Sequence, residues 1–121
     1  MEDSLELREN SLKLIYICSP LKGDVEINIM RANRYCHFAM TKGTLPLAPH
    51  TIFTQFLDDR DEDQRSKGRE LGLALLHRCE ELWCFGDKIT EGMAEEIKLA
   101  KRLRIPIVYF TDTCERRLQN E

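Results

Sequence analysis

The fold is decided by a short apolar segment near the start of the chain, residues 12–18, which reads Leu-Lys-Leu-Ile-Tyr-Ile-Cys. β-Branched and aromatic residues favour strands, and an apolar run of this length is typical of a strand buried inside a sheet. Three later segments are also expected to be strands: 44–48, 82–85 and 105–110. Pro46 weakens the second of these, because proline cannot donate to a strand ladder.

Helical periodicity separates the four segments. After Asp24, a residue suited to a helix N-cap, apolar residues recur every three or four positions as far as Gly43. The same pattern follows in residues 65–79 and again from Thr90 to Arg104. Because strands alternate with helices and no hairpin turn is evident between them, we expect a parallel sheet with helices on both faces. The polar tail, residues 111–121, is expected to be a short helix or frayed.

Length, charge and composition restrict the possible functions. The 121 residues are predicted to form one domain, 1–121, with its core in 12–110, since two cores would each be too small. The 18 basic and 21 acidic residues are interspersed and give a net charge of -3, which argues against nucleic-acid binding. No apolar run approaches the roughly 20 residues of a membrane helix.

The five cysteines and three histidines lack the spacing of a disulfide framework or a metal site. We therefore expect a cytoplasmic protein without a metal ion or cofactor.

Polar residues gather where the predicted strands end. In an open parallel sheet, ligands bind beyond the carboxyl ends of the strands. The segments expected to meet there are 19–23, 49–50, 86–92 and 111–112. Within the first, Ser19, Lys22 and Gly23 supply a hydroxyl, an ammonium group and a flexible turn, as a phosphate or ribose site requires. This loop lacks the spacings of the established phosphate-binding motifs, so an ordinary strand-to-helix turn is the alternative.

The most informative segment is 86–97, which reads Gly-Asp-Lys-Ile-Thr-Glu-Gly-Met-Ala-Glu-Glu-Ile. Glu96 precedes the core-facing Ile97, so its carboxylate is expected near the helix N-terminus rather than far out in solvent. Gly92 costs roughly 1 kcal/mol of helix propensity, which is reasonable if a substrate must approach the backbone there. The alternative is that Glu91, Glu95 and Glu96 only complement the helix dipole.

These segments carry a resemblance to a known superfamily. Residues 15–20, Pro49-His50, residues 92–100 and residues 105–108 resemble the nucleoside 2-deoxyribosyltransferase-like superfamily. Within it, the chain is most similar to small bacterial and phage domains grouped beside the nucleotide-sensing SLOG proteins. The resemblance covers roughly residues 12–110. It implies a Rossmann-like (flavodoxin-like) three-layer α/β sandwich with a four- to five-stranded parallel sheet.

The resemblance also implies N-glycosidic bond chemistry. The glutamate matching Glu96 would attack the anomeric carbon, and Asp87 is the candidate acid for the departing base. The residues expected to contact the nucleoside or nucleotide are Tyr16, Ser19, Pro20, Lys22, Gly23, His50, Gly86, Gly92 and Met93. The chain departs from active transferases in having few other acidic or aromatic candidates around the base.

Two functions stay open at this point. One is an enzyme that transfers or hydrolyses the glycosidic bond of a nucleoside or nucleotide. The other is a SLOG-like module, of a kind that a phage or mobile element could carry, that binds or sequesters a nucleotide-derived ligand without turning it over. In both cases the resemblance implies a homo-oligomer.

Overall fold

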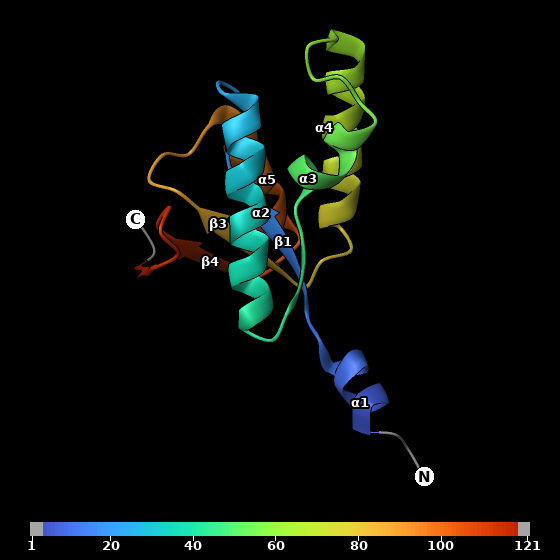
Figure 1. Cartoon of the computed structure of the whole chain (residues 1–121), viewed down its shortest axis with the longest axis vertical. Helices are drawn as coiled ribbons and strands as arrows, with labels where there is room; N and C mark the ends of the chain where they lie inside the picture. The colour runs from blue at the N-terminus through green and yellow to red at the C-terminus, as the bar shows by residue number, and fades with distance from the viewer. Residues whose placement is uncertain (1–3, 119–121) are drawn as a thin grey trace.

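The computed structural model describes residues 4–118 and contains one five-stranded sheet with the strand order β2-β1-β3-β4-β5 (Figure 1). The strands are β1 (Leu14–Cys18), β2 (Leu45–Leu47), β3 (Glu81–Phe85), β4 (Ile107–Phe110) and β5 (Arg116–Arg117). The first four are parallel, and β5 is antiparallel to β4. The predicted α/β class with a largely parallel sheet is confirmed.

The position of each strand follows from its composition. β1 lies between β2 and β3, and Ile15, Tyr16 and Ile17 are fully buried. Pro46 is tolerated in β2 because this strand is at the sheet edge, where one side of the backbone needs no partner. β1 begins at Leu14 rather than Leu12, whose side chain is exposed.

Helices cover both faces of the sheet. They are α1 (Ser4–Ser11), α2 (Val25–Thr41), α3 (Pro49–Ile52), α4 (Glu62–Leu76) and α5 (Glu91–Arg102), with a 3₁₀ turn η1 (Phe53–Gln55) after α3. α2 packs on one face, and α4 and α5 pack on the other (Figure 1). The predicted capping by Asp24 is present, since its carboxylate accepts a hydrogen bond from the Ile27 N–H at 3.2 Å.

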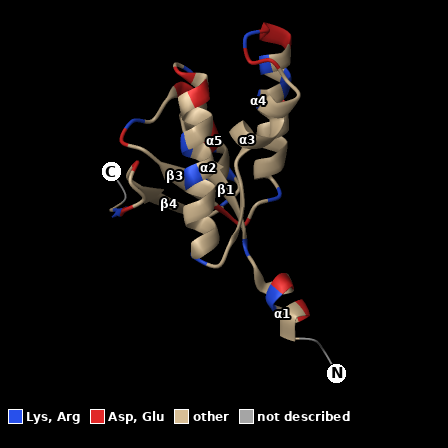
Figure 2. Cartoon of the chain, viewed as in Figure 1, with Lys and Arg blue, Asp and Glu red and all other residues tan. Residues whose placement is uncertain are grey.

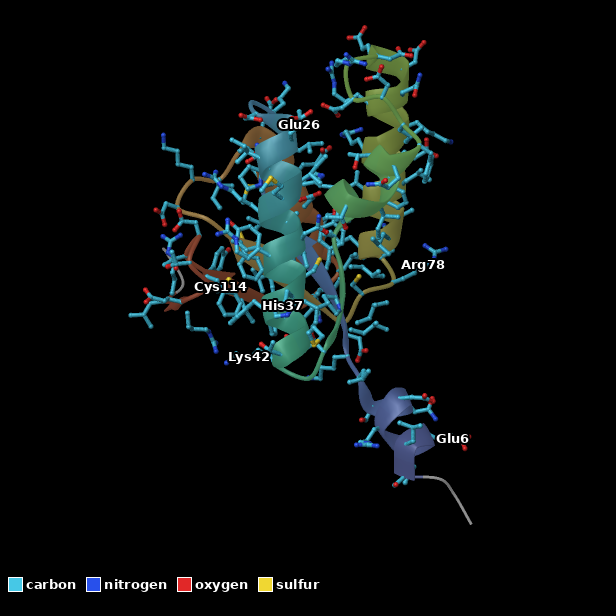
Figure 3. All side chains as sticks on the ribbon, in the orientation of Figure 1. Glu6, Glu26, His37, Lys42, Arg78 and Cys114 are labelled. Carbon is cyan, nitrogen blue, oxygen red and sulfur yellow. The ribbon has the colours of Figure 1, made fainter. Side chains whose placement is uncertain are left out.

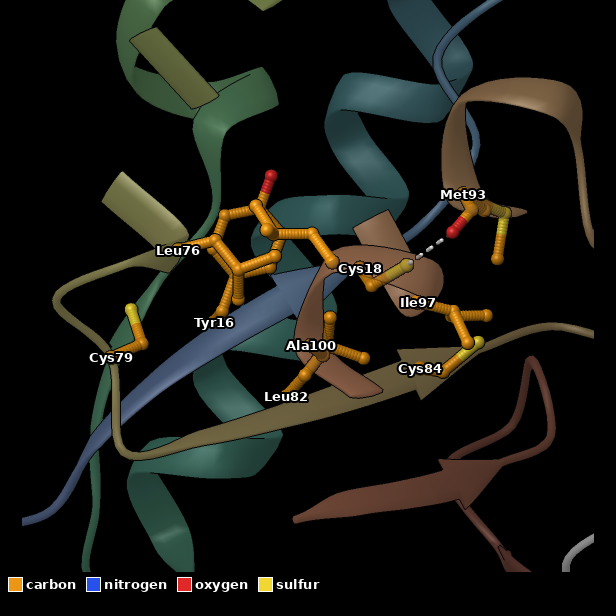
Figure 4. Packing of buried hydrophobic residues seen from close by; sticks show 10 residues of the cluster. Tyr16, Cys18, Leu76, Cys79, Leu82, Cys84, Met93, Ile97 and Ala100 are labelled. Atoms are coloured by element: carbon orange, nitrogen blue, oxygen red, sulfur yellow. Dashed lines mark hydrogen bonds between the residues drawn. The ribbon is translucent and has the colours of Figure 1, made fainter. Parts of the chain in front are cut away.

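Each face of the sheet has its own apolar core. Beneath α2 the core is aromatic, with Tyr35 stacked on Phe85 at a ring-centroid distance of 4.4 Å. On the opposite face, Tyr16 and Cys18 of β1 pack with Ile97 and Ala100 of α5 (Figure 4). Alternate residues of β1 therefore belong to different cores, so a buried Tyr16 faces α4 and α5.

Two expectations about local structure are wrong. The tail is neither helical nor frayed over its described part: residues 111–115 form a turn, and β5 pairs with β4 as a hairpin. The helix expected at 65–79 begins at Glu62 and ends at Leu76, because Asp61 caps it earlier and accepts a hydrogen bond from the Asp63 N–H. The acidic segment 58–63 therefore includes the first residues of a helix.

α1 was not predicted. None of its residues is buried, and Figure 3 shows its side chains, with Glu6 labelled, apart from the sheet. Charged residues of both signs are spread over several elements (Figure 2). Within residues 4–118, no helix is long and apolar enough to cross a membrane.

Candidate active site between α4 and α5

An open cleft of about 1320 Å³ lies at the carboxyl end of β1. Its walls are the β1–α2 turn, α3, α4 and the first turns of α5. Predicted site residues at its surface are Ser19, Lys22, His50, Gly92, Met93 and Glu96. The structure thus brings together residues from three of the four segments expected to meet at the strand ends.

Glu96 is positioned by the start of α5. The Thr90 hydroxyl caps this helix by accepting a hydrogen bond from the Met93 N–H at 3.2 Å. Met93 and Ile97 face the sheet, and Glu96 lies between them on the side that borders the cleft. There its Oε2 accepts a hydrogen bond from the Tyr16 hydroxyl at 2.5 Å.

The surroundings of Glu96 disfavour the ionised form of its carboxyl group. Burial raises the pKa of this carboxyl group from 4.5 to about 7, while the Tyr16 hydroxyl and the Cys18 thiol act in the opposite direction and Glu95 adds to the rise. Burial also raises the pKa of Tyr16 well above 10.0, and the adjacent Glu96 contributes. Tyr16 therefore stays protonated as a donor while Glu96 titrates near neutral pH.

The β1–α2 turn is held from two sides. Ser19 is 2% exposed, and within residues 4–118 its Oγ has no hydrogen-bond partner. His50 Nε2 donates to the Ser19 carbonyl oxygen at 2.9 Å. Burial lowers the pKa of His50, which the Ser19 carbonyl opposes, so we expect a neutral imidazole with its proton on Nε2.

Asn28, which is 8% exposed, fixes the same turn from α2. Its Nδ2 donates to the carbonyl oxygens of Leu21 and Lys22, both at 3.0 Å. Sequence reasoning missed this residue. Asn28 lies four and seven residues before the buried Ala32 and Tyr35, on the same face of α2. This spacing is the signal that could have found it, since a polar side chain at a core-facing position needs a partner.

Other predicted site residues lie outside the cleft wall. Tyr16 reaches Glu96 from the sheet beneath, and Pro20 and Gly23 belong to the turn without lining the cleft. Gly23 has a φ of +102°, so it serves to redirect the chain into α2. A Cβ at Gly92 would meet nothing within 4 Å, so that position leaves open space at the cleft.

Asp87 does not line the cleft that Glu96 borders. Gly86, with a φ of +110°, turns the chain toward β4 and β5, and its carbonyl oxygen accepts a hydrogen bond from Arg117 Nη1 at 2.9 Å. Asp87 is exposed and lines a second hollow of about 360 Å³, which shares Ala94 and Lys98 with the cleft. That hollow also contains Lys101, Tyr109 and Arg117.

Two features of α4 complete the site and were not foreseen. A Cβ at Gly72 would lie 3.4 Å from the Tyr16 hydroxyl, so the glycine lets the helix approach the Tyr16–Glu96 pair closely. Arg69 makes a two-point ion pair across the cleft with Glu95, and its Nε lies 2.7 Å from Glu95 Oε1. Within residues 4–118, no group of three His, Cys, Asp or Glu side chains is placed to hold a metal ion.

Solved structures with this arrangement of elements include two 2-deoxyribosyltransferases. The enzyme from Bacillus psychrosaccharolyticus superposes with a TM-score of 0.62 at 16% identity, over 88% of this chain and 77% of that one. The enzyme from Leishmania mexicana gives 0.59 at 18% identity, over 82% of this chain and 64% of its own. A conserved protein from Enterococcus faecalis V583 gives 0.58 at 20% identity, over 83% and 64%.

These similarities define the class: the chain has a 2-deoxyribosyltransferase-like fold, as the sequence resemblance implied. More particularly, residues 13–110 match the family described as a domain of unknown function, DUF7768, and the chain belongs to that family. No curated protein sequence matches the chain. The chain spans just under two thirds of the length of the Leishmania and Enterococcus structures.

Proposed function

We propose that this protein is an enzyme that cleaves or transfers the N-glycosidic bond of a nucleoside or nucleotide, with Glu96 as the nucleophile. The observation that carries the proposal is the Glu96 carboxyl group, which borders an open cleft, accepts a 2.5 Å hydrogen bond from Tyr16 and has a pKa raised to about 7. Carboxyl groups perturbed in this way are concentrated at catalytic sites. The fold shared with two 2-deoxyribosyltransferases supports the same chemistry.

The proposed reaction has two displacements. An oxygen of the ionised Glu96 attacks the anomeric carbon, the bond between that carbon and the base nitrogen breaks, and its electron pair leaves with the base, which takes up a proton in the solvent-open cleft. Water or a second base then attacks the same carbon and releases Glu96. A nearby anion stabilises the oxocarbenium-like transition state, and the covalent intermediate divides one high barrier into two lower ones.

Other residues of the cleft fit supporting roles. The Tyr16 hydroxyl holds one carboxylate oxygen, which leaves the other available for attack. The buried Ser19 hydroxyl and the Lys22 ammonium group, on the turn fixed by Asn28 and His50, are suited to hold the sugar or its phosphate. Gly92 would leave room for the substrate at the start of α5.

A second candidate is favoured by the position of Asp87. Asp87 is not among the residues that line the cleft beside Glu96; it lines a second hollow, which shares Ala94 and Lys98 with the cleft. A cleft with a perturbed carboxylate but without that acid also suits a module that binds a nucleotide-derived ligand and leaves it intact. Such a module would use the same turn and the same cleft.

One experiment separates the two candidates. Purified protein is incubated with a panel of nucleosides, 2′-deoxynucleosides and their 5′-monophosphates, and free base is measured by chromatography. The wild type is compared with Glu96→Gln and, as a matched control, Glu91→Gln on the exposed first turn of the same helix. Base release that is lost only in Glu96→Gln, with a glycosyl adduct on the wild-type protein by mass spectrometry, supports the enzyme.

No release from any substrate refutes the enzyme. A ligand that then raises the melting temperature of the wild type and of Glu96→Gln equally, and is recovered unchanged, supports the binding module.

Domain organisation, assembly and location belong to the same proposal. We propose one domain over residues 1–121, a homo-oligomer and a cytoplasmic protein. Light scattering of the purified chain tests the assembly, because a monomer at all concentrations would contradict it.

A further inference from the structure

The Arg69–Glu95 ion pair joins the two helices that wall the cleft. Arg69 lies in the middle of α4, and Glu95 lies in α5, directly before Glu96. The guanidinium Nε and Nη2 each donate to a different oxygen of the Glu95 carboxylate. Two parallel hydrogen bonds of this kind fix the orientation of both groups more strongly than a single contact does.

This pair differs from an ordinary surface ion pair in what lies beside it. The Lys67–Glu70 pair, for comparison, lies along α4 alone, three residues apart, at 3.4 Å. The Arg69–Glu95 pair instead bridges residues 26 positions apart, and its carboxylate belongs to the residue preceding the proposed nucleophile. The side chain of Glu95 is 36% exposed, so part of its field acts through protein rather than water.

The titratable groups that face Glu96 come from every element packed against it. They are Tyr16 and Cys18 of β1, Cys84 of β3, Glu95 of α5 and, through Glu95, Arg69 of α4. Burial raises the pKa of Tyr16, whereas the hydrogen bond between the two thiols raises the pKa of Cys18 and lowers that of Cys84. Glu95 is the anion whose charge raises the pKa of Glu96. An unneutralised anion there would oppose the ionisation of Glu96.

We infer that Arg69 is a positioning residue: by pairing with Glu95 across the cleft, it neutralises the carboxylate next to Glu96 and thereby favours the ionised form of Glu96 that attacks. The inference rests on the proposed function for the role of that ionised form. The electrostatic coupling among Arg69, Glu95 and Glu96 can nevertheless be measured without any substrate. Arg69 itself touches no reacting atom in this scheme.

The coupling is tested by titrating Glu96 in the full-length protein. Glutamate carboxyl carbons are labelled with ¹³C, the Glu96 signal is assigned by its loss in Glu96→Gln, and its midpoint is followed by NMR from pH 4 to 9. Arg69→Gln is expected to raise the midpoint by about half a unit or more, and Glu95→Gln to lower it. In the variant that combines Arg69→Gln with Glu95→Gln, the Glu96 midpoint should return to the wild-type value or fall below it.

Lys67→Gln provides the matched control, since it removes a positive charge from the same helix and breaks the pair that does not reach α5. Its Glu96 midpoint should stay at the wild-type value. An Arg69→Gln midpoint that stays unchanged, falls, or moves no more than that of Lys67→Gln would overturn the inference. Arg69→Gln and Glu95→Gln are expected to shift the Glu96 midpoint in opposite directions, which a general loss of structure in either variant would not produce.

The NMR titration and the base-release assay can fail independently of each other. If the wild type releases no base but the midpoints shift as expected, the coupling stands and the enzymatic proposal fails. If the wild type releases base but the midpoints do not move, the enzymatic proposal stands and the coupling between Arg69 and Glu96 is refuted. In an active enzyme the acidic limb of the pH–rate profile should move with the midpoint, roughly halving the rate of Arg69→Gln at pH 7 while a high-pH plateau is retained.

Discussion

Glu96→Gln is expected to make the protein more stable above pH 7 and to abolish base release. Glutamine has nearly the shape of glutamic acid, and its amide oxygen can still accept the hydrogen bond from Tyr16. What the substitution removes is the ionised carboxylate in a partly buried position. Under the proposed function this loss of stability is expected, because the environment of a functional group is arranged for reaction rather than for folding.

The magnitude follows from the pKa of Glu96. A rise from 4.5 to about 7 on folding means that the native state binds the proton more tightly than the unfolded chain does. The stability from protonated Glu96 is fully present below about pH 4.5 and is lost as the pH rises through about 7. The complete loss is up to about 3 kcal/mol, at 1.36 kcal/mol per unit, so Glu96→Gln should gain about that much at pH 8 and about 1 kcal/mol at pH 5.

Urea denaturation at pH 5 and pH 8 measures this difference. Trp83, the single tryptophan, is 9% exposed in the core and provides a fluorescence signal for unfolding. Glu91→Gln serves as the control, because it removes a first-turn acid at an exposed position and should change stability by only a few tenths of a kcal/mol. A Glu96→Gln variant that is no more stable than the wild type at pH 8, or that gains equally at both pH values, would refute the reasoning.

Two further substitutions test the supports of the site. Tyr16→Phe removes the 2.5 Å donor to Glu96, so it should raise the Glu96 titration midpoint and destabilise the protein by about 2 kcal/mol at pH 8, with a smaller effect at pH 5. Equal losses at both pH values in urea denaturation would indicate that the hydroxyl does not act on the carboxylate. Asn28→Ala leaves the carbonyls of Leu21 and Lys22 without their donor and should cost about 1–2 kcal/mol. A thermal-shift titration with a ligand of the cleft should show weaker binding, and unchanged binding with unchanged stability would contradict the role given to this side chain.

The strands and the capped helices could be predicted because their signals are local. Residues 12–18 contain the apolar run of β1, and Asp24 and Thr90 precede the helices that they cap. The exposure of α1 and the pairing of β5 had no such signal. β5 is only two residues long and polar, and it forms because the turn at 111–115 places it beside β4.

The candidate site was only partly predictable, for a related reason. Glu96, Ser19 and His50 could be placed together because all three follow the strand ends of a parallel sheet. Asp87 satisfies the same rule, yet Gly86 is tied to β4 and β5, and Asp87 lines the neighbouring hollow instead of the cleft. Local sequence gives the end of a strand but not the direction in which the next residues leave it.

The sequence by itself determined the α/β class, the succession of the four parallel strands with α2, α4 and α5 between them, and the position of a carboxylate near the start of α5. These depend on periodicity and capping, which involve residues a few positions apart. Only the tertiary structure decided what surrounds that carboxylate: a tyrosine hydroxyl 80 residues earlier in the chain and an arginine of α4 paired with its neighbour Glu95. The pKa of Glu96 depends on burial and on these distant groups, and both exist only once the helices have packed on the sheet.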